Sequence, residues 1–368
     1  MITVDAGVLA KAMRHAAAVT ERRNTIPILS NVLLVATGET LSIVTTDLDL
    51  QFSQTVPLRT GGELITTVDS QRLATLAGAV ENGAQISLEL KDKRLTVKSG
   101  RGRWVLPVLP RDDFPVIVAG DFEASIDLPG AALARAIGRV GVAISTEETR
   151  YYLNGIFLSP DAGQVRFVAT DGHRMMAVTV DAVWPENAPE AIVPRKFART
   201  LEKLAAEFGE GVVSLAWSAS KARAEIGPVT LLGKTIDGSF PDYRRVIPSV
   251  EDTPVAFDPA VLRGAVRRVA LIATEKTRAV KLTRAADRLV LDVTSPDNGT
   301  ASEELPADCD VSGTGGFECG FNAAYLGDML EAIGGDTIEL HHADAGAPAL
   351  FRRKVPDGAL GVLMPMRV

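Results

Sequence analysis

The sequence predicts an α+β protein built from three tandem copies of one domain, in which two helices pack on antiparallel strands. Strand-like alternations of apolar residues begin at Leu41, Val165 and Leu289, with an equal interval of 124 residues between them. Each alternation leads into polar turn residues, most clearly at 170–172, where Thr, Asp and Gly follow one another. A pattern that returns at a constant interval indicates repeated structural units. The length of 368 residues also suits three domains of about 100–150 residues.

Composition narrows the class of protein. The hydrophobic content of 46% lets each third of the chain bury a core, while no apolar run reaches the ~18 residues that a membrane span requires. The first residues lack the features of a signal peptide, and Cys309 and Cys319 are too few and too isolated for a disulfide framework or a zinc site. We therefore expect a cytoplasmic protein with no metal or cofactor. The net charge of −7 argues against a simple basic nucleic-acid-binding protein.

The first copy, over residues 1–121, begins with an amphipathic helix. Residues such as Leu9 and Met13 recur at helical spacing and form its apolar face. A second helix is predicted to have Asp69 or Ser70 as its N-cap, because both residue types favour that position. The predicted elements are, in order, a helix over 5–20, a hairpin over 32–43 with its turn at 37–38, a helix over 69–80, and strands over 85–90, 95–98 and 101–106.

The second copy, over residues 122–251, and the third, over residues 252–368, repeat this order. Their first helices have apolar faces that contain Leu133 and Leu262, which match Leu9 of the first copy. For the second copy the sequence predicts a strand over 122–128, a helix from 130, strands on both sides of a turn at 161–164, and a helix over 194–208. For the third it predicts a strand over 255–258, a helix through 262–269, a turn at 295–299, a helix over 322–333, and strands from 337 onward.

Asp171 and His173 are the residues that most suggest catalysis, as an acid–base pair or as part of a triad. Such a site also needs a nucleophile or a metal within reach. The sequence has no GxSxG, P-loop, GxGxxG or HExxH motif. We therefore favour a non-catalytic protein and keep a hydrolase that uses Asp171 and His173 as an alternative.

Basic residues gather on the first helix of each copy, although the whole chain is acidic. A charged stripe on one helix is usually a solvated face, but its recurrence on three equivalent helices favours a shared positive surface. Aromatic residues make up only 5% of the chain, so we expect contacts with phosphates rather than base stacking. The residues are Lys11, Arg14, Arg135, Arg139, Arg263, Arg267 and Arg268, and we expect Arg135, Arg139, Arg263 and Arg267 to point outward.

The segment 361–368 combines two methionines with a proline. Pro365 cannot donate a backbone hydrogen bond to a neighbouring strand, so a strand should end there or lie at a sheet edge. Two methionines around a proline would equally suit an adaptable, partly exposed apolar groove. A core strand and a groove wall both remain open.

Eight short segments, spread through all three copies, match one family of proteins. They cover residues 25–29, 46–48, 150–155, 170–174, 193–196, 240–246, 320–322 and 364–367. Through them the sequence resembles the bacterial sliding clamps, the beta subunits of DNA polymerase III. Each segment is short, but together they are highly specific and extend over essentially the whole chain.

The resemblance implies three DNA-clamp domains per chain and a ring-shaped, head-to-tail homodimer around double-stranded DNA, bound without sequence preference. Such a ring is not an enzyme but a processivity factor of DNA replication. The implied partners are the catalytic subunit of DNA polymerase III, the clamp loader, other DNA polymerases and repair proteins. A specialised clamp paralogue with altered partners is the alternative.

The resemblance also implies a dimer interface and a DNA-binding surface. Strand 103–107 of one chain is expected to pair with 301–305 of its partner. The implied interface residues are Arg101, Arg103, Trp104, Leu106, Leu271, Ile272, Glu303 and Glu304. The implied DNA contacts are Arg23, Arg150, Tyr151, Tyr152 and Lys196.

A groove between the second and third domains is expected to bind partner peptides of the Gln-Leu-x-Leu-Phe type. Thr277 and Met175 depart from the Phe and Leu that are common there in the family, which affects the preferred peptide. The groove residues that the resemblance implies are Leu153, Thr170, Gly172, His173, Arg174, Met175, Pro241, Arg245, Val246, Asn322, Tyr325, Val362, Met364, Pro365, Met366 and Arg367.

Overall fold

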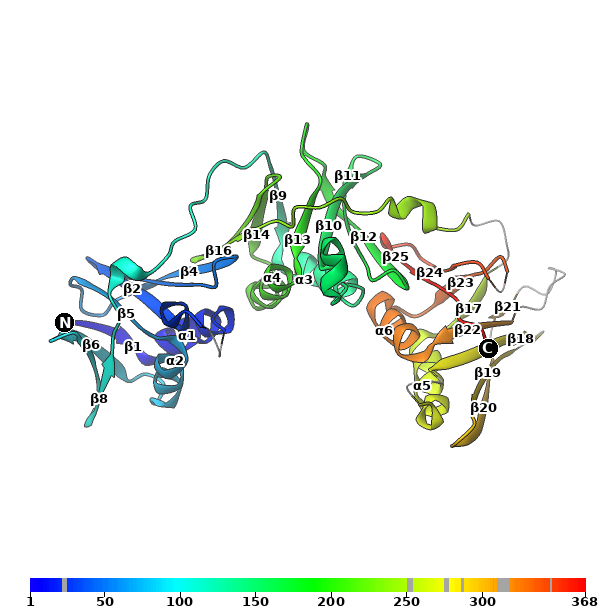
Figure 1. Cartoon of the computed structure of the whole chain (residues 1–368), viewed down its shortest axis with the longest axis horizontal. Helices are drawn as coiled ribbons and strands as arrows, with labels where there is room; N and C mark the ends of the chain where they lie inside the picture. The colour runs from blue at the N-terminus through cyan, green and yellow to red at the C-terminus, as the bar shows by residue number, and fades with distance from the viewer. Residues whose placement is uncertain are drawn as a thin grey trace. The chain divides into compact units, whose positions relative to one another are not determined.

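The computed structural model describes residues 1–21, 25–249, 254–274, 278–285, 288–306, 308–309, 318–344 and 346–368, with the backbone alone at 285, 308 and 309. Arg23, Thr277 and the expected border at 251–252 lie outside these residues. Three successive sets of helices and antiparallel strands follow one another along the chain (Figure 1). Strands β3 (Thr40–Thr46), β11 (Gln164–Thr170) and β19 (Arg288–Ser295) keep the constant interval predicted from the sequence, which confirms the repeat.

Each helix of the first repeat begins directly after a capping aspartate. The Asp5 carboxylate accepts hydrogen bonds from the backbone N–H groups of Gly7 and Val8 at the start of helix α1 (Ala6–Val19). Asp69 caps helix α2 (Ser70–Ala79) through Arg72 N, so Asp69 rather than Ser70 is the cap. The other elements are β1 (Ile2–Asp5), η1 (Pro27–Ser30), β2 (Asn31–Thr37), β3, β4 (Leu50–Pro57), β5 (Leu64–Asp69), β6 (Gln85–Lys91), β7 (Arg94–Ser99), β8 (Gly102–Pro107) and η2 (Arg111–Asp113).

The second repeat has the predicted pair of helices and more strands than the sequence pattern indicated. Its helices are α3 (Gly130–Gly141) and α4 (Arg195–Phe208). The short helical turns are η3 (Glu148–Leu153) and η4 (Tyr243–Val246). The strands are β9 (Ala124–Pro129), β10 (Gly155–Asp161), β11, β12 (Arg174–Val183), β13 (Ala191–Pro194), β14 (Val212–Trp217), β15 (Lys221–Ile226) and β16 (Val229–Lys234).

The third repeat again uses polar caps. Asp258 caps helix α5 (Pro259–Val269), and Asn322 caps helix α6 (Ala323–Ile333) by accepting from the N–H groups of Ala324 and Tyr325. The other elements are β17 (Val255–Phe257), η5 (Ala270–Ile272), β18 (Ala279–Ala285), β19, β20 (Gly299–Pro306), β21 (Asp308–Cys309), β22 (Glu318–Asn322), β23 (Ile338–His341), β24 (Ala349–Arg353) and β25 (Ala359–Leu363).

The first of two compact units joins the first repeat to part of the second. It comprises residues 1–133, 185–189 and 200–235. Its large sheet has the strand order β5-β2-β3-β4-β16-β15-β14-β9, and its small sheet has the order β1-β6-β7-β8. Strands β4 and β16 pair antiparallel, with Gln54 opposite Val229. The large sheet therefore continues from one repeat into the next.

The second compact unit comprises residues 134–184, 190–199 and 236–368. Its large sheet has the order β13-β10-β11-β12-β25-β24-β23-β17-β21, and its small sheet has the order β20-β19-β18-β22. Strands β12 and β25 pair antiparallel, with Arg174 opposite Leu363. The middle and last repeats are joined by this pairing.

The core lies between the helices and the sheets. Helix α1 packs against α2, β3 and β4, and α5 packs against α6 and β19 (Figure 1). Leu9, Leu133 and Leu262 are fully buried, which confirms the apolar faces predicted for the three first helices. Among the described residues, no helix is long and apolar enough to cross a membrane.

Candidate functional site

The turn between β11 and β12 is held by its own polar side chains. Asp171 Oδ1 accepts hydrogen bonds from the backbone N–H groups of His173 at 2.9 Å and Arg174 at 3.0 Å. Thr170 Oγ1 donates to the Arg174 carbonyl oxygen at 2.7 Å and accepts from Gly172 N at 3.1 Å. Gly172 has a φ of +87°, which a residue with a side chain adopts only under strain. The Asp171 carboxylate thus organises the turn, and no hydrogen bond joins it to the His173 ring among the described residues.

Arg174 fixes this turn to helix α6. Its guanidinium contacts Asp171 at 3.1 Å through Nε and Asp328 at 2.8 Å through Nη1, and its central carbon lies 4.3 Å from the centre of the Tyr325 ring. The His173 ring stacks on Tyr325 with 6.3 Å between ring centres. Two adjacent residues of the middle repeat therefore lie against one helix of the last repeat.

A cavity of about 280 Å³ opens beside this turn. Its floor is apolar, since Leu153, Met175 and Val362 are each at most 3% exposed. Its rim carries cationic and hydrogen-bonding side chains. The lining residues are Arg150, Tyr152, Leu153, Thr170, Gly172, His173, Arg174, Met175, Pro241, Asp242, Tyr243, Val246, Val362 and Met364. An apolar floor with a polar rim suits a ligand that carries large apolar side chains.

Aromatic packing places η4 over the cavity. Phe240 stacks on Phe157 with 4.6 Å between ring centres, and the Tyr243 hydroxyl lies 3.0 Å from Ser159 Oγ in the buried core. Asp242 and Tyr243 line the cavity, although the sequence pattern did not single them out. The segment 240–246 is recognisable in the sequence, but side-chain direction within it cannot be inferred from the pattern.

Six of the expected groove residues lie outside the cavity lining. Arg245 is exposed and pairs with Asp242 at 3.0 Å, whereas Asn322 caps α6. The Tyr325 ring contacts the Arg174 guanidinium and stacks with the His173 ring. The remaining three residues, Pro365, Met366 and Arg367, belong to the tail that follows β25.

This tail combines both structures considered for 361–368. Strand β25 ends at Leu363, in the buried core. Beyond it, Met364 N donates to the His173 carbonyl oxygen at 2.9 Å, and Met366 N donates to the Gly320 carbonyl oxygen at 2.7 Å. Met364 and Met366 are 40% and 39% exposed. The segment is therefore a core strand first and a partly exposed wall afterwards.

Arg150 and Tyr152, expected to contact DNA, line the cavity. Arg150 donates to Glu147 through Nε and Nη2, each at 2.8 Å. This hydrogen-bonded pair lowers the pKa of Glu147 and raises that of Arg150. A side chain at Gly172 would overlap the Arg150 guanidinium. The glutamate three residues before Arg150 is the sequence signal for this pairing.

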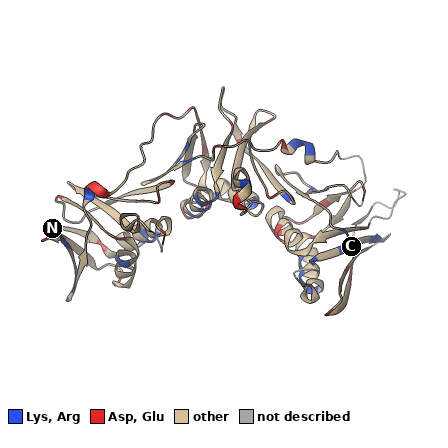
Figure 2. Ribbon diagram, in the orientation of Figure 1, with Lys and Arg blue, Asp and Glu red and all other residues tan. Residues whose placement is uncertain are grey.

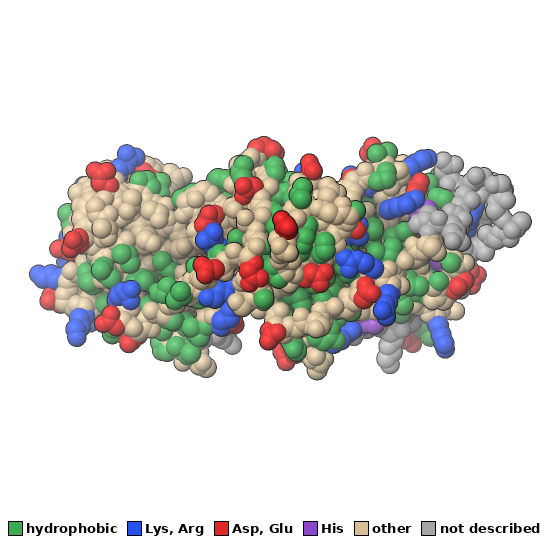
Figure 3. All heavy atoms as spheres, turned by 90° about the horizontal axis from the view of Figure 1, so that it is seen from above, with side chains coloured by type: hydrophobic (Ala, Val, Ile, Leu, Met, Phe, Trp, Pro, Cys, Tyr) green, Lys and Arg blue, Asp and Glu red, His purple; other side chains and the backbone are tan. Residues whose placement is uncertain are grey.

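The other expected DNA contacts are placed differently. Tyr151 is 53% exposed and meets Tyr152 edge to face, and Lys196 lies in the first turn of α4. Figure 3 shows acidic and basic side chains interspersed on one face of the molecule.

The position of the Arg139 side chain contradicts one prediction from the sequence. The sequence pattern predicted that it points outward from α3, but only 12% of its side chain is exposed. It forms an ion pair with Asp357 at 2.8 Å, and Asp357 also binds Arg353 at 2.8 Å. The partner lies far away in the sequence, so helical periodicity alone could not reveal that this cation is buried.

Comparisons with known proteins cover the whole chain. Three family models match: the DNA polymerase III beta subunit N-terminal domain over residues 1–118, its central domain over 127–242 and its C-terminal domain over 244–367. The beta sliding clamp of Caulobacter vibrioides is 41% identical, with 100% of both chains covered. The chain belongs to the DNA polymerase III beta subunit family.

Solved structures of this family agree. The DNA polymerase sliding clamp of Pseudomonas aeruginosa has a TM-score of 0.94 at 34% identity, covering 100% of this chain and 99% of the other. The sliding clamp of Bartonella birtlesii, crystallised with bound griselimycin, has a TM-score of 0.95 at 37% identity and the same coverage. The three tandem clamp domains predicted from the sequence are confirmed.

The two strands that the family resemblance assigned to subunit pairing lie at sheet edges. Strand β8 ends the sheet β1-β6-β7-β8, and β20 ends the sheet β20-β19-β18-β22. Trp104 is 39% exposed, and Leu271 is 79% exposed. A mostly apolar cavity of about 510 Å³ lies between α2 and β8 and includes Trp104 and Leu106 in its lining. Free edges beside exposed apolar side chains are suited to association.

The two interface carboxylates that the family resemblance implied, Glu303 and Glu304, already have partners in the single chain. Glu303 binds Arg268 through a charge-assisted pair, which lowers the pKa of Glu303, and Glu304 contacts Arg288 at 2.7 Å. Arg101 and Arg103 are exposed.

Among the described residues, no group of histidine, cysteine and carboxylate side chains could hold a metal ion.

Proposed function

We propose that this chain is a DNA sliding clamp of bacterial replication: a homodimeric ring that encircles duplex DNA and tethers DNA polymerase III and other proteins to it. The observation that carries the proposal is the match along the full length of the chain to relatives named beta sliding clamp. The ring is a processivity factor without catalytic activity. The Asp171 carboxylate holds its own turn and, among the described residues, forms no acid–base pair with His173, which supports this assignment.

Ring closure is proposed to be head to tail. Strand β8 of one chain adds to β20 of its partner, and Leu271 and Ile272 enter the apolar cavity beside Trp104. Because Glu303 and Glu304 are already paired within the chain, apolar burial rather than new ion pairs provides most of the stabilisation. The proposed domain borders are 121–122 and 251–252.

The cavity beside the 170–174 turn is the proposed site for short partner peptides of the Gln-Leu-x-Leu-Phe type. Leucine and phenylalanine anchors fit its apolar floor, and the hydrogen-bonding side chains of its rim fit polar neighbours. Polymerases, the clamp loader and repair proteins would then compete for one site. We propose the bacterial cytoplasm as the place of action, since the DNA lies there.

Topological retention on DNA tests the central proposal. The labelled protein is loaded onto nicked circular DNA with the clamp loader of its own organism, washed at high salt, and the DNA is then cut once. Retention before the cut and release after it are expected, because a ring slides off a free end. Release at equal rates from circular and linear DNA would contradict the proposal.

Peptide binding tests the groove separately. We expect a fluorescent Gln-Leu-x-Leu-Phe peptide to bind the intact chain with micromolar or tighter affinity, and binding to disappear when Met364–Val368 are removed. The matched control is a peptide with alanine at both apolar anchors. Binding that survives removal of the tail would place the peptide elsewhere.

A further inference from the structure

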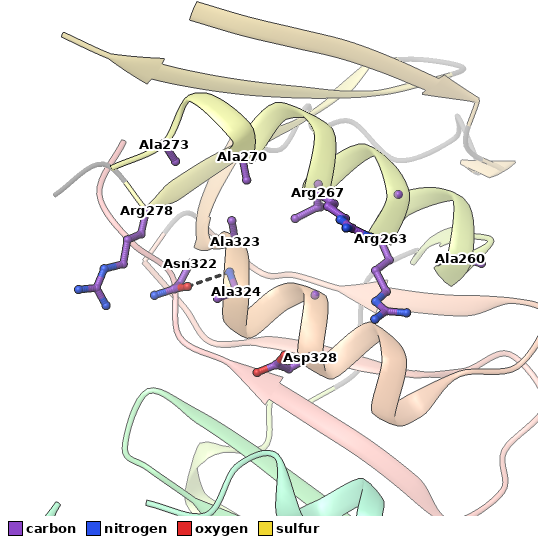
Figure 4. A pocket seen from close by; sticks show the side chains of 13 residues that line it. Ala260, Arg263, Arg267, Ala270, Ala273, Arg278, Asn322, Ala323, Ala324 and Asp328 are labelled. Carbon is purple, nitrogen blue, oxygen red and sulfur yellow. Dashed lines mark hydrogen bonds between the residues drawn. The ribbon is translucent and has the colours of Figure 1, made fainter. Parts of the chain in front are cut away.

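Four of the seven basic residues on the first helices have acidic partners. Lys11 contacts Glu207 at 3.4 Å, and Arg139 contacts Asp357 at 2.8 Å. Arg263 contacts Glu331 at 2.5 Å (Figure 4 shows its side chain extending from α5 toward α6), and Arg268 pairs with Glu303. A cation that is already paired contributes little to attracting another anion, since the fields of the two opposite charges largely cancel at distances beyond their own separation.

The other three, Arg14, Arg135 and Arg267, are exposed. Among the described residues, none of these three guanidinium groups forms a hydrogen bond or an ion pair. Each repeat contributes one of them. Arg14 and Arg267 also occupy the same helical position, nine residues after the capping aspartates Asp5 and Asp258. Figure 2 marks basic residues on α1 and α5.

The described linings of the cavities beside Arg14 and Arg267 hold no acidic side chain that lacks a basic partner. A cavity of about 780 Å³ between α1 and α2 includes Arg14, and its described lining has no acidic residue. A cavity of about 550 Å³ between α5 and α6 includes Arg267, and Asp328 is the one acid in its described lining (Figure 4). Asp328 is already paired with Arg174 at 2.8 Å. An anion that approaches either arginine therefore meets a net positive environment.

We infer that Arg14, Arg135 and Arg267 contact DNA phosphates from the first helices, whereas Lys11, Arg139, Arg263 and Arg268 do not. This inference rests on the proposed function and identifies which cations serve it. An unpaired guanidinium offers its planar set of N–H donors to a phosphate without first breaking an ion pair. The consequence is one such phosphate interaction per repeat, which holds DNA loosely and without reading its sequence.

Salt dependence of DNA binding tests the assignment with two matched double variants. Arg14→Gln with Arg267→Gln and Lys11→Gln with Arg263→Gln each remove one positive charge from α1 and one from α5. Affinity for a short fluorescent duplex is measured by anisotropy across a series of salt concentrations. The slope of log affinity against log salt falls by about 0.9 for each phosphate that the protein no longer neutralises.

We expect the Arg14 and Arg267 double variant to reduce the slope by about 3–4 per two-chain ring, and the Lys11 and Arg263 variant by less than ~1. Both should bind the groove peptide like the wild type, which shows that the fold is intact. Equal slopes for the two double variants would overturn the assignment alone. A wild type that binds no duplex and is not retained on circular DNA would overturn the proposed function and the assignment together.

Discussion

Two arginine–aspartate pairs, each three residues apart in sequence, differ mainly in burial. Arg174 and Asp171 have side chains that are 11% and 15% exposed, whereas Arg245 and Asp242 are 83% and 49% exposed, at nearly the same separation. Removing one partner of a buried pair leaves an uncompensated charge in a poorly solvated place. Water compensates the exposed pair almost completely.

We therefore expect Arg174→Ala to lower the free energy of unfolding by about 3 kcal/mol, and Arg245→Ala to lower it by less than ~1 kcal/mol. Urea unfolding followed by circular dichroism measures both values. Arg174→Ala should also weaken peptide binding, because the turn loses its attachment to Tyr325 and Asp328. Equal losses of stability in the two variants would mean that burial does not govern these pairs.

Cys319 is the buried thiol of the described structure. Burial, with a smaller contribution from the Asp344 charge, raises the pKa of its thiol to about 12. The reactive thiolate is therefore nearly absent at neutral pH. In a Cys309→Ser background, Ellman's reagent should label Cys319 slowly in the native protein and rapidly in denaturant. Fast labelling of the native state would contradict the burial argument.

At the scale of elements, β8 and β20 are exposed sheet edges, so side chains of the proposed interface can be changed without disturbing the fold of the single chain. Leu271 is 79% exposed in the single chain, so its removal costs the isolated fold little. In the ring, Leu271 and Ile272 would each bury apolar surface worth about 1.5–3 kcal/mol. A change there should act on association and leave the monomer stable.

We expect Leu271→Ala with Ile272→Ala to convert the dimer to monomers at micromolar concentration, while added salt alone does not. Sedimentation velocity measures the oligomeric state. Val355→Ala is the matched control, because Val355 is an equally exposed apolar residue, at 80%, and it follows β24, which belongs to a different sheet from β8 and from β20. A double variant that stays dimeric at sub-micromolar concentration would refute the proposed interface.

The helices were more predictable than the sheets. Asp5, Asp69, Asp258 and Asn322 each stop a strand and cap the following helix through their own side chains, and such local signals are visible in sequence. The large sheets depend instead on pairings between distant segments, such as β12 with β25. The same limit explains the site: the groove segments were recognisable, but the Asp357 partner of Arg139 and the cavity position of Arg150 depend on the folded chain.

At the scale of the whole molecule, Glu207 joins the first repeat to the second within one compact unit. Both of its oxygens lie 3.1 Å from His15 Nε2, and Lys11 Nζ lies 3.4 Å away. Burial raises the pKa of Glu207, but the hydrogen bonds and charges of His15 and Lys11 lower it by more, so the net shift is downward. A carboxylate with a lowered pKa stabilises the fold above its ordinary pKa, and this stabilisation is lost as the pH falls through the folded value.

We expect Glu207→Gln to lower the free energy of unfolding by no more than ~1 kcal/mol at neutral pH, because the pair is partly exposed. The difference from wild type should shrink as the pH falls below the ordinary range of a glutamate and disappear once the pH is below the lowered pKa of Glu207. Urea titrations at a series of pH values measure it, with Glu210→Gln as a control that removes the same charge nearby. A difference that grows on acidification would show that the sign is wrong.

The pairing of β4 with β16 has a consequence for synthesis. Gln54 lies opposite Val229, so a ribosome must add well over a hundred residues after β4 before its partner exists. Throughout that time one edge of β4 has no partner strand, and β12 in the same way has no partner until β25 is made. Such long-range pairing slows folding and exposes nascent chains to wrong partners. We infer that this chain depends on chaperones during translation more than a protein of three self-contained domains would.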